Sequence, residues 1–244
     1  MVAKVGFLYP GYSAEDDFPR LEAMLNEAGA DVRLPLVHTD IGIDAHRVDA
    51  LLEMGSVDRL TAVLDELTAG QGVQAVVWAC TSASFVFGHE GAREQVRRLS
   101  AAAGLPASST SFAFARAVAA LGVRRVAVAA TYPEDVAGLF ADFLKAADIE
   151  VVATRGSGII TAAEVGTWGR EEVLRLARAG DDPDAEAVLL PDTALHSAAW
   201  VAELESALGK PVLTANQVTA WEGLRLLGQR AVCPSLGTLF AARG

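Results

Sequence analysis

Hydrophobic residues in this chain fall into short continuous runs that alternate with longer segments, in which apolar positions recur every three or four residues. Runs such as residues 73–80 and 125–131 are rich in valine and alanine, which is typical of strands buried on both faces of a parallel sheet. The longer segments are typical of amphipathic helices that connect one parallel strand to the next. The alternation therefore predicts an α/β fold built on doubly wound parallel sheets.

The same pattern gives the bounds of these elements. Strands are expected at residues 3–9, 31–37, 73–80, 105–109, 125–131, 150–155, 186–191 and 211–215. Helices are expected at residues 15–28, 56–70, 89–103, 111–121, 133–147, 170–179, 197–208 and 217–227. Glycines favour left-handed C-caps that end helices, and they stand near expected helix ends at residues 29, 104, 122, 180, 209 and 228.

Two stretches of the chain repeat one order of features. In the first, a buried run ends at Cys80 and leads through a helix and a Gly-x-Pro segment to Thr110, where a second helix begins. In the second, a buried run ends at Asp192 and leads in the same way to Asn216. Thr110 and Asn216 are expected to be helix N-caps. The repeat predicts two similar lobes, with Cys80 and Asp192 on facing walls of the cleft between them.

We expect an N-terminal lobe formed by residues 1–112 together with 217–244, and a C-terminal lobe formed by residues 113–216. The apolar helix at residues 111–121 would leave a hydrophobic face exposed. Such a face favours a homodimer or a higher homo-oligomer.

Composition narrows the class of protein. The 244 residues carry a formal net charge of −11, which excludes the basic surface that nucleic-acid binding requires. The longest apolar runs hold only about eight residues, whereas a membrane helix needs ~20. Two distant cysteines and four scattered histidines fit neither a disulfide framework nor a metal site. No dinucleotide or phosphate-loop motif occurs. We expect a cytoplasmic protein without cofactor or metal.

Cys80 is the strongest candidate for chemistry, because it stands at the carboxyl end of a predicted strand, where ligands bind in open α/β sheets. The hydroxyl-rich turn that follows it offers backbone N–H groups that could bind an anion and lower the pKa of the thiol. The alternative is a structural cysteine, since free cysteines are often small core residues. Cys233 lacks polar neighbours in the sequence, and we expect it to be structural.

Several segments resemble the aspartate/glutamate racemase superfamily, and within it the branch of maleate cis-trans isomerases and arylmalonate decarboxylases. The cysteine-threonine-serine segment is the most specific of them. These segments cover residues 79–85 (ACTSASF), 131–133 (TYP), 158–165 (GIITAAEV), 192–195 (DTAL) and 209–217 (GKPVLTANQ).

The resemblance implies a cofactor-independent enzyme with two α/β lobes related by a pseudo-twofold axis, which binds a small carboxylic acid between them. Cys80 would be the first catalytic cysteine, which acts as the nucleophile in the isomerase branch. The remaining motif residues would bind substrate: Thr81, Ser82, Tyr132, Thr193 and Asn216. Tyr9, at the end of the first strand, could bind substrate with them or could instead belong to a surface loop.

Asp192 departs from the family pattern, because it occupies the position of the second catalytic cysteine. The loop after the first strand also lacks the asparagine that isomerases of this branch carry. A two-thiol racemase would need matched groups on opposite faces of the substrate. Asp192 is either a site residue or, alternatively, the N-cap of the helix that begins near His196 or a turn aspartate.

Three kinds of function remain open. In an isomerase, the Cys80 thiolate would add to an activated alkene and leave again after rotation, with a protonated Asp192 as its acid partner. In a decarboxylase or racemase, Cys80 would transfer one proton, and an ionised Asp192 would suit an amino-acid derivative as substrate. A protein that has lost catalysis would only bind a small molecule.

Overall fold

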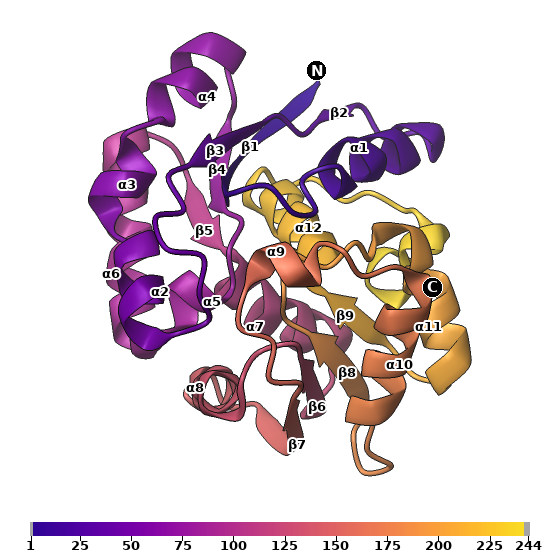
Figure 1. Ribbon diagram of the computed structural model, residues 1–244. Helices are drawn as coiled ribbons and strands as arrows, with labels where there is room; N and C mark the ends of the chain where they lie inside the picture. Colours follow the sequence, from indigo (N-terminus) through magenta and orange to yellow (C-terminus); the bar gives the residue numbers. More distant parts are fainter. Residues whose placement is uncertain (1, 242–244) are drawn as a thin grey trace.

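The computed structural model describes residues 2–241 and contains two all-parallel sheets, which confirms the predicted α/β class (Figure 1). The first sheet has the order β2-β1-β4-β5, with β3 also paired to β1, and the second has the order β7-β6-β8-β9. The strands are β1 (Ala3–Pro10), β2 (Val32–Arg33), β3 (Leu36–Thr39), β4 (Ala75–Trp78), β5 (Ala107–Ser109), β6 (Arg125–Ala130), β7 (Glu150–Gly156), β8 (Ala187–Leu190) and β9 (Val212–Thr214).

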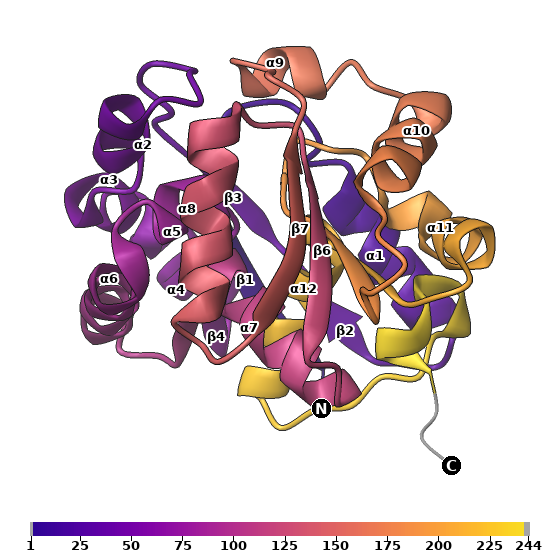
Figure 2. The ribbon, with the colours of Figure 1, turned by 90° about the horizontal axis from the view of Figure 1, so that it is seen from below.

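The helices cover the faces of both sheets, and Figure 2 shows α8 and α10 on opposite faces of the second sheet. The helices are α1 (Asp17–Glu27), α2 (Val48–Met54), α3 (Val57–Thr61), α4 (Leu64–Gln71), α5 (Ser82–Phe85), α6 (Gly88–Ala103), α7 (Thr110–Leu121), α8 (Glu134–Lys145), α9 (Ala162–Val165), α10 (Arg170–Gly180), α11 (Val201–Leu208) and α12 (Ala215–Leu226). Short 3-10 turns are η1 (Ala198–Trp200), η2 (Pro234–Leu236) and η3 (Thr238–Phe240).

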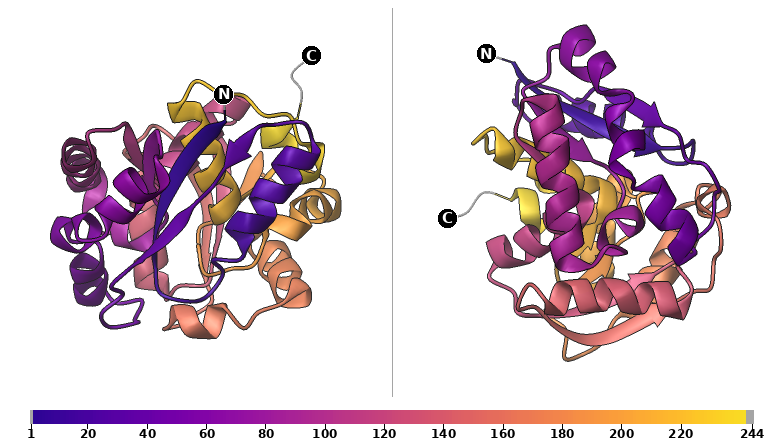
Figure 3. Two further views of the ribbon diagram at one scale, coloured as in Figure 1. Left: turned by 90° about the horizontal axis from the view of Figure 1, so that it is seen from above. Right: turned by 90° about the vertical axis from the view of Figure 1, so that its left-hand side faces the viewer.

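The two sheets have the same strand order when β2 and β3 are taken as one interrupted strand. β1 then lies between β2/β3 and β4, as β6 lies between β7 and β8. This equivalence agrees with the internal repeat of the sequence. Helices α7 and α12 follow the equivalent strands β5 and β9, and they pack against each other between the sheets (Figures 1 and 3). α12 also contacts β1, β4 and β5 of the first sheet, so it joins the two lobes.

The interface between α7 and α12 is polar at its centre. The hydroxyl groups of Thr110 and Thr219 lie 2.6 Å apart. The carboxylate of Glu222 is fully buried, and it accepts hydrogen bonds from Arg116 and, at 2.6 Å, from Arg225. Two guanidinium groups thus compensate one buried carboxylate, which would otherwise be strongly unfavourable.

The expected exposed face on the helix at residues 111–121 is wrong. Phe114, Ala117 and Val118 of α7 are fully buried within the chain, because this helix packs against α12 and the core. The apolar pattern of this helix is thus explained inside one chain.

Several predicted boundaries also differ from the structure. The strand expected at residues 31–37 is split into β2 and β3, because Pro35 lacks the backbone N–H that would continue the ladder. The helix expected at 56–70 is divided into α3 and α4. Thr110 and Asn216 lie inside the first helical turn, and the N-caps are Ser109 and Thr214, because each helix starts directly at its strand end.

The short helices α2, α5 and α9 are additions to the predicted elements. Positive φ angles confirm the expected glycine C-caps at Gly104 and Gly122. Gly180 is different, since it ends α10 without a positive φ and packs closely on Ala129.

Gly55 ends α2 against the turn that carries Cys80. The side chain of Gln95 donates to the carbonyl oxygens of Gly55, at 2.7 Å, and of Ala83, at 2.9 Å, and so ties the two segments together. A Cβ at residue 55 would collide with the Ala83 oxygen, whereas a Cβ at Gly138 in α8 would meet open space.

We therefore expect Gly55→Ala to lower the free energy of unfolding by about 1–3 kcal/mol, because backbone must move to admit the methyl group. Gly138→Ala is the matched control and should raise it by about 0.4–1 kcal/mol, because alanine restricts the unfolded chain. Urea unfolding measures both. Equal stabilities of the two variants would contradict this close contact.

Candidate active site

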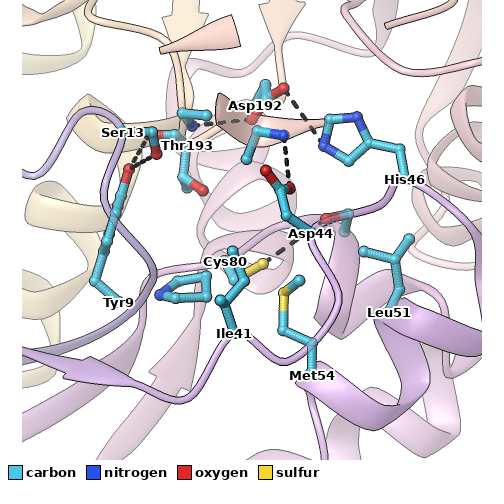
Figure 4. Close-up of a pocket in the computed structure, with 14 residues that line it drawn as sticks. Tyr9, Ser13, Ile41, Asp44, His46, Leu51, Met54, Cys80, Asp192 and Thr193 are labelled. Carbon is cyan, nitrogen blue, oxygen red and sulfur yellow. Dashed lines mark hydrogen bonds and ion pairs between the residues drawn. The ribbon is translucent and has the colours of Figure 1, made fainter. Parts of the chain in front are cut away.

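A cavity of about 340 Å3, including the part open to solvent, lies where the carboxyl ends of strands from the two sheets meet (Figure 4). Asp192 and His46 lie on one side of it, and Cys80 lies with Met54 and Ile41 on the other. The lining residues are Tyr9, Pro10, Ser13, Ile41, Asp44, His46, Leu51, Met54, Cys80, Ser82, Ala162, Asp192, Thr193 and Ala194.

Cys80 follows β4 by two residues and begins a tight turn into α5. Its side chain is 3 % exposed, and Sγ lies 3.8 Å from the hydroxyl oxygen of Ser82. The turn is held from behind, because the Ser111 hydroxyl donates to the Thr81 carbonyl at 2.9 Å. Cys80 is therefore fixed in position and faces the cavity with little access to water.

The pKa of the Cys80 thiol is raised to about 11. Burial is the main cause, and the charge of Asp192 adds to it. Hydrogen bonds from the backbone of Ala83 and from Ser82 lower the pKa, but by less than burial raises it. The expectation of a lowered thiol pKa is thus wrong for this structure, because the helix that follows is short and the sulfur is dehydrated.

Asp192 lies directly beyond β8 and Pro191, and it is 4 % exposed. Its Oδ1 accepts a hydrogen bond from the backbone of Ala194 at 2.9 Å, and its Oδ2 accepts one from the Thr131 hydroxyl. It is not the cap of the next helical turn, since η1 is preceded by Ser197. Asp192 therefore shapes its own turn and also faces the cavity.

His46 is a site residue that the sequence patterns did not indicate. Its Nε2 lies 3.9 Å from Oδ2 of Asp192, and its Nδ1 lies 2.9 Å from the carbonyl oxygen of Ile159. The imidazole meets the ring of Tyr132 edge-on, with centroids 4.8 Å apart. A carbonyl at Nδ1 requires a proton there, so Nε2 is the nitrogen available to Asp192 or to a ligand.

Asp44, on the same loop as His46, is a second residue that sequence reasoning missed. Its carboxylate accepts hydrogen bonds from the backbone N–H groups of Ala162, at 2.8 Å, and Ala163, at 3.0 Å. The loop after β3 is thereby attached to the first residues of α9, in the half of the chain that forms the other sheet. The only sequence signal for this loop is its position beyond a strand end.

Tyr9 and Thr193 face the cavity together, as expected for the end of β1. The Tyr9 hydroxyl donates to the Thr193 carbonyl at 2.9 Å and lies 3.0 Å from the Ser13 hydroxyl. Burial raises the pKa of Tyr9, so the phenol stays protonated and acts as a donor. The surface-loop alternative applies to Tyr12 instead, which is 78 % exposed.

Thr81, Tyr132 and Asn216 do not line the cavity, although all three are buried. The Tyr132 hydroxyl donates to the Pro191 carbonyl at 2.8 Å, and burial raises its pKa. The amide of Asn216 donates to the Thr193 carbonyl at 3.1 Å. As placed here, Tyr132 and Asn216 support the wall that carries Asp192 and Thr193.

Cys233 is buried and contacts the Met24 carbonyl, which agrees with a structural cysteine. Within residues 2–241, no cluster of three or more His, Cys, Asp or Glu side chains could hold a metal ion. No helix of that part of the chain is both long and apolar enough to cross a membrane.

The family model for arylmalonate decarboxylase matches residues 42–240. The solved maleate isomerase Iso from Pseudomonas putida S16 has a TM-score of 0.88, at 24% identity over 99% of this chain and 99% of that chain. The Nocardia farcinica maleate cis-trans isomerase, solved with a covalently bound succinylcysteine intermediate, has a TM-score of 0.84, at 21% identity over 100% of both chains. Arylmalonate decarboxylase has a TM-score of 0.75, at 27% identity over 97% of this chain and 98% of that chain. Comparison with curated protein sequences gives no match.

The raised pKa of Cys80 predicts how its reaction with iodoacetamide depends on pH. Below the pKa the thiolate fraction grows tenfold with each pH unit, so alkylation in a Cys233→Ser background should accelerate up to about pH 11. Mass spectrometry of the Cys80 peptide gives the rate, and the Cys80→Ser variant serves as control. A rate that levels off below pH 8 would contradict the dehydrated thiol.

Proposed function

The chain belongs to the arylmalonate decarboxylase family, and on this premise we propose that it interconverts the cis and trans forms of a small unsaturated dicarboxylic acid of the maleate type. The observation that carries the proposal is the arrangement of Cys80 and Asp192 on different walls of one cavity. A nucleophile and a proton-transfer group separated by a space for substrate are what covalent cis-trans isomerisation requires.

Cys80 would act through addition and elimination. In place of the protonated Asp192 expected from the sequence, this mechanism starts from its carboxylate. The thiol gives its proton to Asp192, and the sulfur forms a bond to one alkene carbon while the π electrons move to the other. Asp192 returns the proton to that second carbon, which leaves a thioether with a single bond that rotates. Reversal of these steps breaks the C–S bond and restores the double bond, the thiol and the carboxylate. The sequence is redox-neutral and consumes no co-reactant.

The resting thiol is compatible with this chemistry. With a pKa of about 11 it is protonated at neutral pH, so a partner must accept its proton during addition. Asp192 is the neighbour proposed for this role, because its charge contributes to the raised pKa of Cys80. This need for a base distinguishes the site from one in which a second thiol performs the proton transfer.

The substrate carboxylates would be held by dipoles rather than by cations. Among the described residues that line the cavity there is no lysine or arginine. The Ser82 hydroxyl and the backbone N–H groups of the turn after Cys80 supply donors on one wall. Donors fixed by the fold stabilise charge that develops on a carboxylate during addition, because they need not reorient. Thr81 and Asn216 remain proposed carboxylate-binding residues, which would require movement on binding.

Decarboxylation of a substituted malonate is the second candidate. It is supported by the apolar side chains of Ile41, Leu51 and Met54 in the cavity, which would accept an aryl or alkyl group. Loss of carbon dioxide would leave an enediolate, and Cys80 would deliver a proton to its carbon. Here too a raised thiol pKa is suitable, because the thiol acts as an acid.

Proton NMR in D2O distinguishes these functions. The purified protein is incubated separately with maleate, phenylmalonate, aspartate and glutamate, beside the Cys80→Ser variant. We expect conversion of maleate to fumarate by the native protein and none by the variant, because serine is a far weaker nucleophile. Formation of phenylacetate from phenylmalonate would show that the protein is a decarboxylase and not an isomerase. Deuterium exchange at an amino-acid Cα would indicate a racemase. Turnover of maleate by the Cys80→Ser variant would contradict the assignment of Cys80 as the nucleophile.

Asp192→Asn tests the proton-transfer role. Asparagine keeps an oxygen that accepts from Ala194 but cannot accept the thiol proton, so kcat should fall by about 10²–10⁴-fold. Asp142→Asn, at an exposed position of α8, is the matched control and should leave kcat unchanged. A full rate in Asp192→Asn would assign the proton transfer to another group.

A further inference from the structure

A second cavity, of about 460 Å3 including its open part, lies away from Cys80, beside the first turn of α1. It is bounded by α1, the segment before α10 and the segment around η1, and it shares no lining residue with the first cavity. α1 contacts η1 directly. Its lining residues are Asp17, Arg20, Trp168, His196, Ala199 and Trp200.

Asp17 is a buried carboxylate with one oxygen to spare. Its side chain is 1 % exposed, and its Oδ2 accepts hydrogen bonds from the backbone of Ser197, at 2.9 Å, and Ala198, at 3.1 Å. The Asn216 amide donates to the same oxygen at 3.1 Å. Among residues 2–241 no group donates to Oδ1, although Asp17 lines the cavity. A carboxylate oxygen at the cavity wall that receives no hydrogen bond from the described residues can accept one from a ligand.

Arg20 is a free cation on the same face of α1. It follows Asp17 by three residues, which places the two side chains on one side of the helix. Arg20 is exposed and forms no ion pair with any described residue. The nearby His196 is different, because its Nε2 is 2.8 Å from Oδ1 of Asp16. The cavity therefore offers one carboxylate and one guanidinium group that form no ion pair with the described residues.

Trp168 and Trp200 complete the cavity with two partly exposed indoles. Indole rings bury apolar or aromatic ligand surface, and their faces attract cations. We propose that this second cavity binds a free α-amino acid with an apolar or aromatic side chain. Its ammonium group donates to Asp17 Oδ1, its carboxylate pairs with Arg20, and its side chain packs on the indoles.

The site would be separate from the proposed catalysis but joined to it through one side chain. Asn216 divides its amide hydrogens between Asp17 and the Thr193 carbonyl, and Thr193 lines the first cavity. Binding of the amino acid depends only on residues of the second cavity. The proposal is therefore independent of which reaction Cys80 performs.

Isothermal titration calorimetry of the intact protein tests the proposal with three probes. L-Phenylalanine carries both charges, phenethylamine only the ammonium and 3-phenylpropionate only the carboxylate. We expect L-phenylalanine to bind at least about tenfold more tightly than either partial probe, because each lacks one charge pair. A value of the dissociation constant above tens of millimolar for L-phenylalanine, leucine and tryptophan would overturn the proposal.

Two variants locate the binding. Asp17→Asn keeps an oxygen for the three existing donors but turns an amide N–H2 towards the ammonium, so L-phenylalanine should bind at least about tenfold more weakly. Arg20→Gln should weaken L-phenylalanine similarly and leave phenethylamine unchanged. Arg98→Gln, at another exposed arginine, is the control. Since Arg20 is exposed, that variant should fold, and unaltered L-phenylalanine affinity in it would overturn the proposal even if Asp17→Asn is unstable.

Discussion

The packing of α7 against α12 is the constraint on which the rest of this structure depends. These helices occupy equivalent places after β5 and β9, and they bring together two sheets of identical strand order. All strands in a parallel sheet end at the same edge, so fixing the two sheets also fixes which side chains meet between them. The buried Glu222 makes this contact specific, because its partner Arg116 lies on α7, and sliding the helices would break that pair and leave only Arg225 of the same helix.

Dehydration is the main physical property of the resulting site. Cys80, Tyr9 and Tyr132 all have raised pKa values with burial as the first cause, and the charge of Asp192 contributes to each. Neutral thiol and phenol groups thus lie near Asp192, where electrostatic interactions are stronger than in water, and Asp44 is a second carboxylate of the same cavity. Such a site favours chemistry that moves one proton over a short path, and both proposed reactions are of this kind.

The sequence predicted the placement of Cys80 and Asp192 because that placement follows from local pattern. Continuous apolar runs specify β4 and β8, and a residue just beyond each run must lie at the edge of its sheet. His46 and Asp44 could not be predicted in this way. Their positions depend on contacts with Ile159, Ala162 and Ala163, which are more than a hundred residues away in the chain. The direction of the Cys80 pKa was missed for a related reason, since burial is a property of the whole fold.

The internal repeat predicted some features of the fold correctly and missed others. It identified equivalent strand ends but placed both helix N-caps too late, because the helices begin directly at the ends of β5 and β9. The substitution of an aspartate at the second strand end is visible in sequence, whereas its hydrogen bonds to Ala194 and Thr131 are not. These bonds show that the aspartate is held towards the cavity.

Intact-mass spectrometry of the protein quenched in acid during reaction with maleate tests covalent catalysis by Cys80 most directly. Our account predicts a mass increase equal to one molecule of the substrate, which peptide mapping assigns to Cys80 and which is absent from Cys80→Ser. Steady conversion of maleate to fumarate without any adduct, together with a Cys80→Ser variant of full activity, would contradict it.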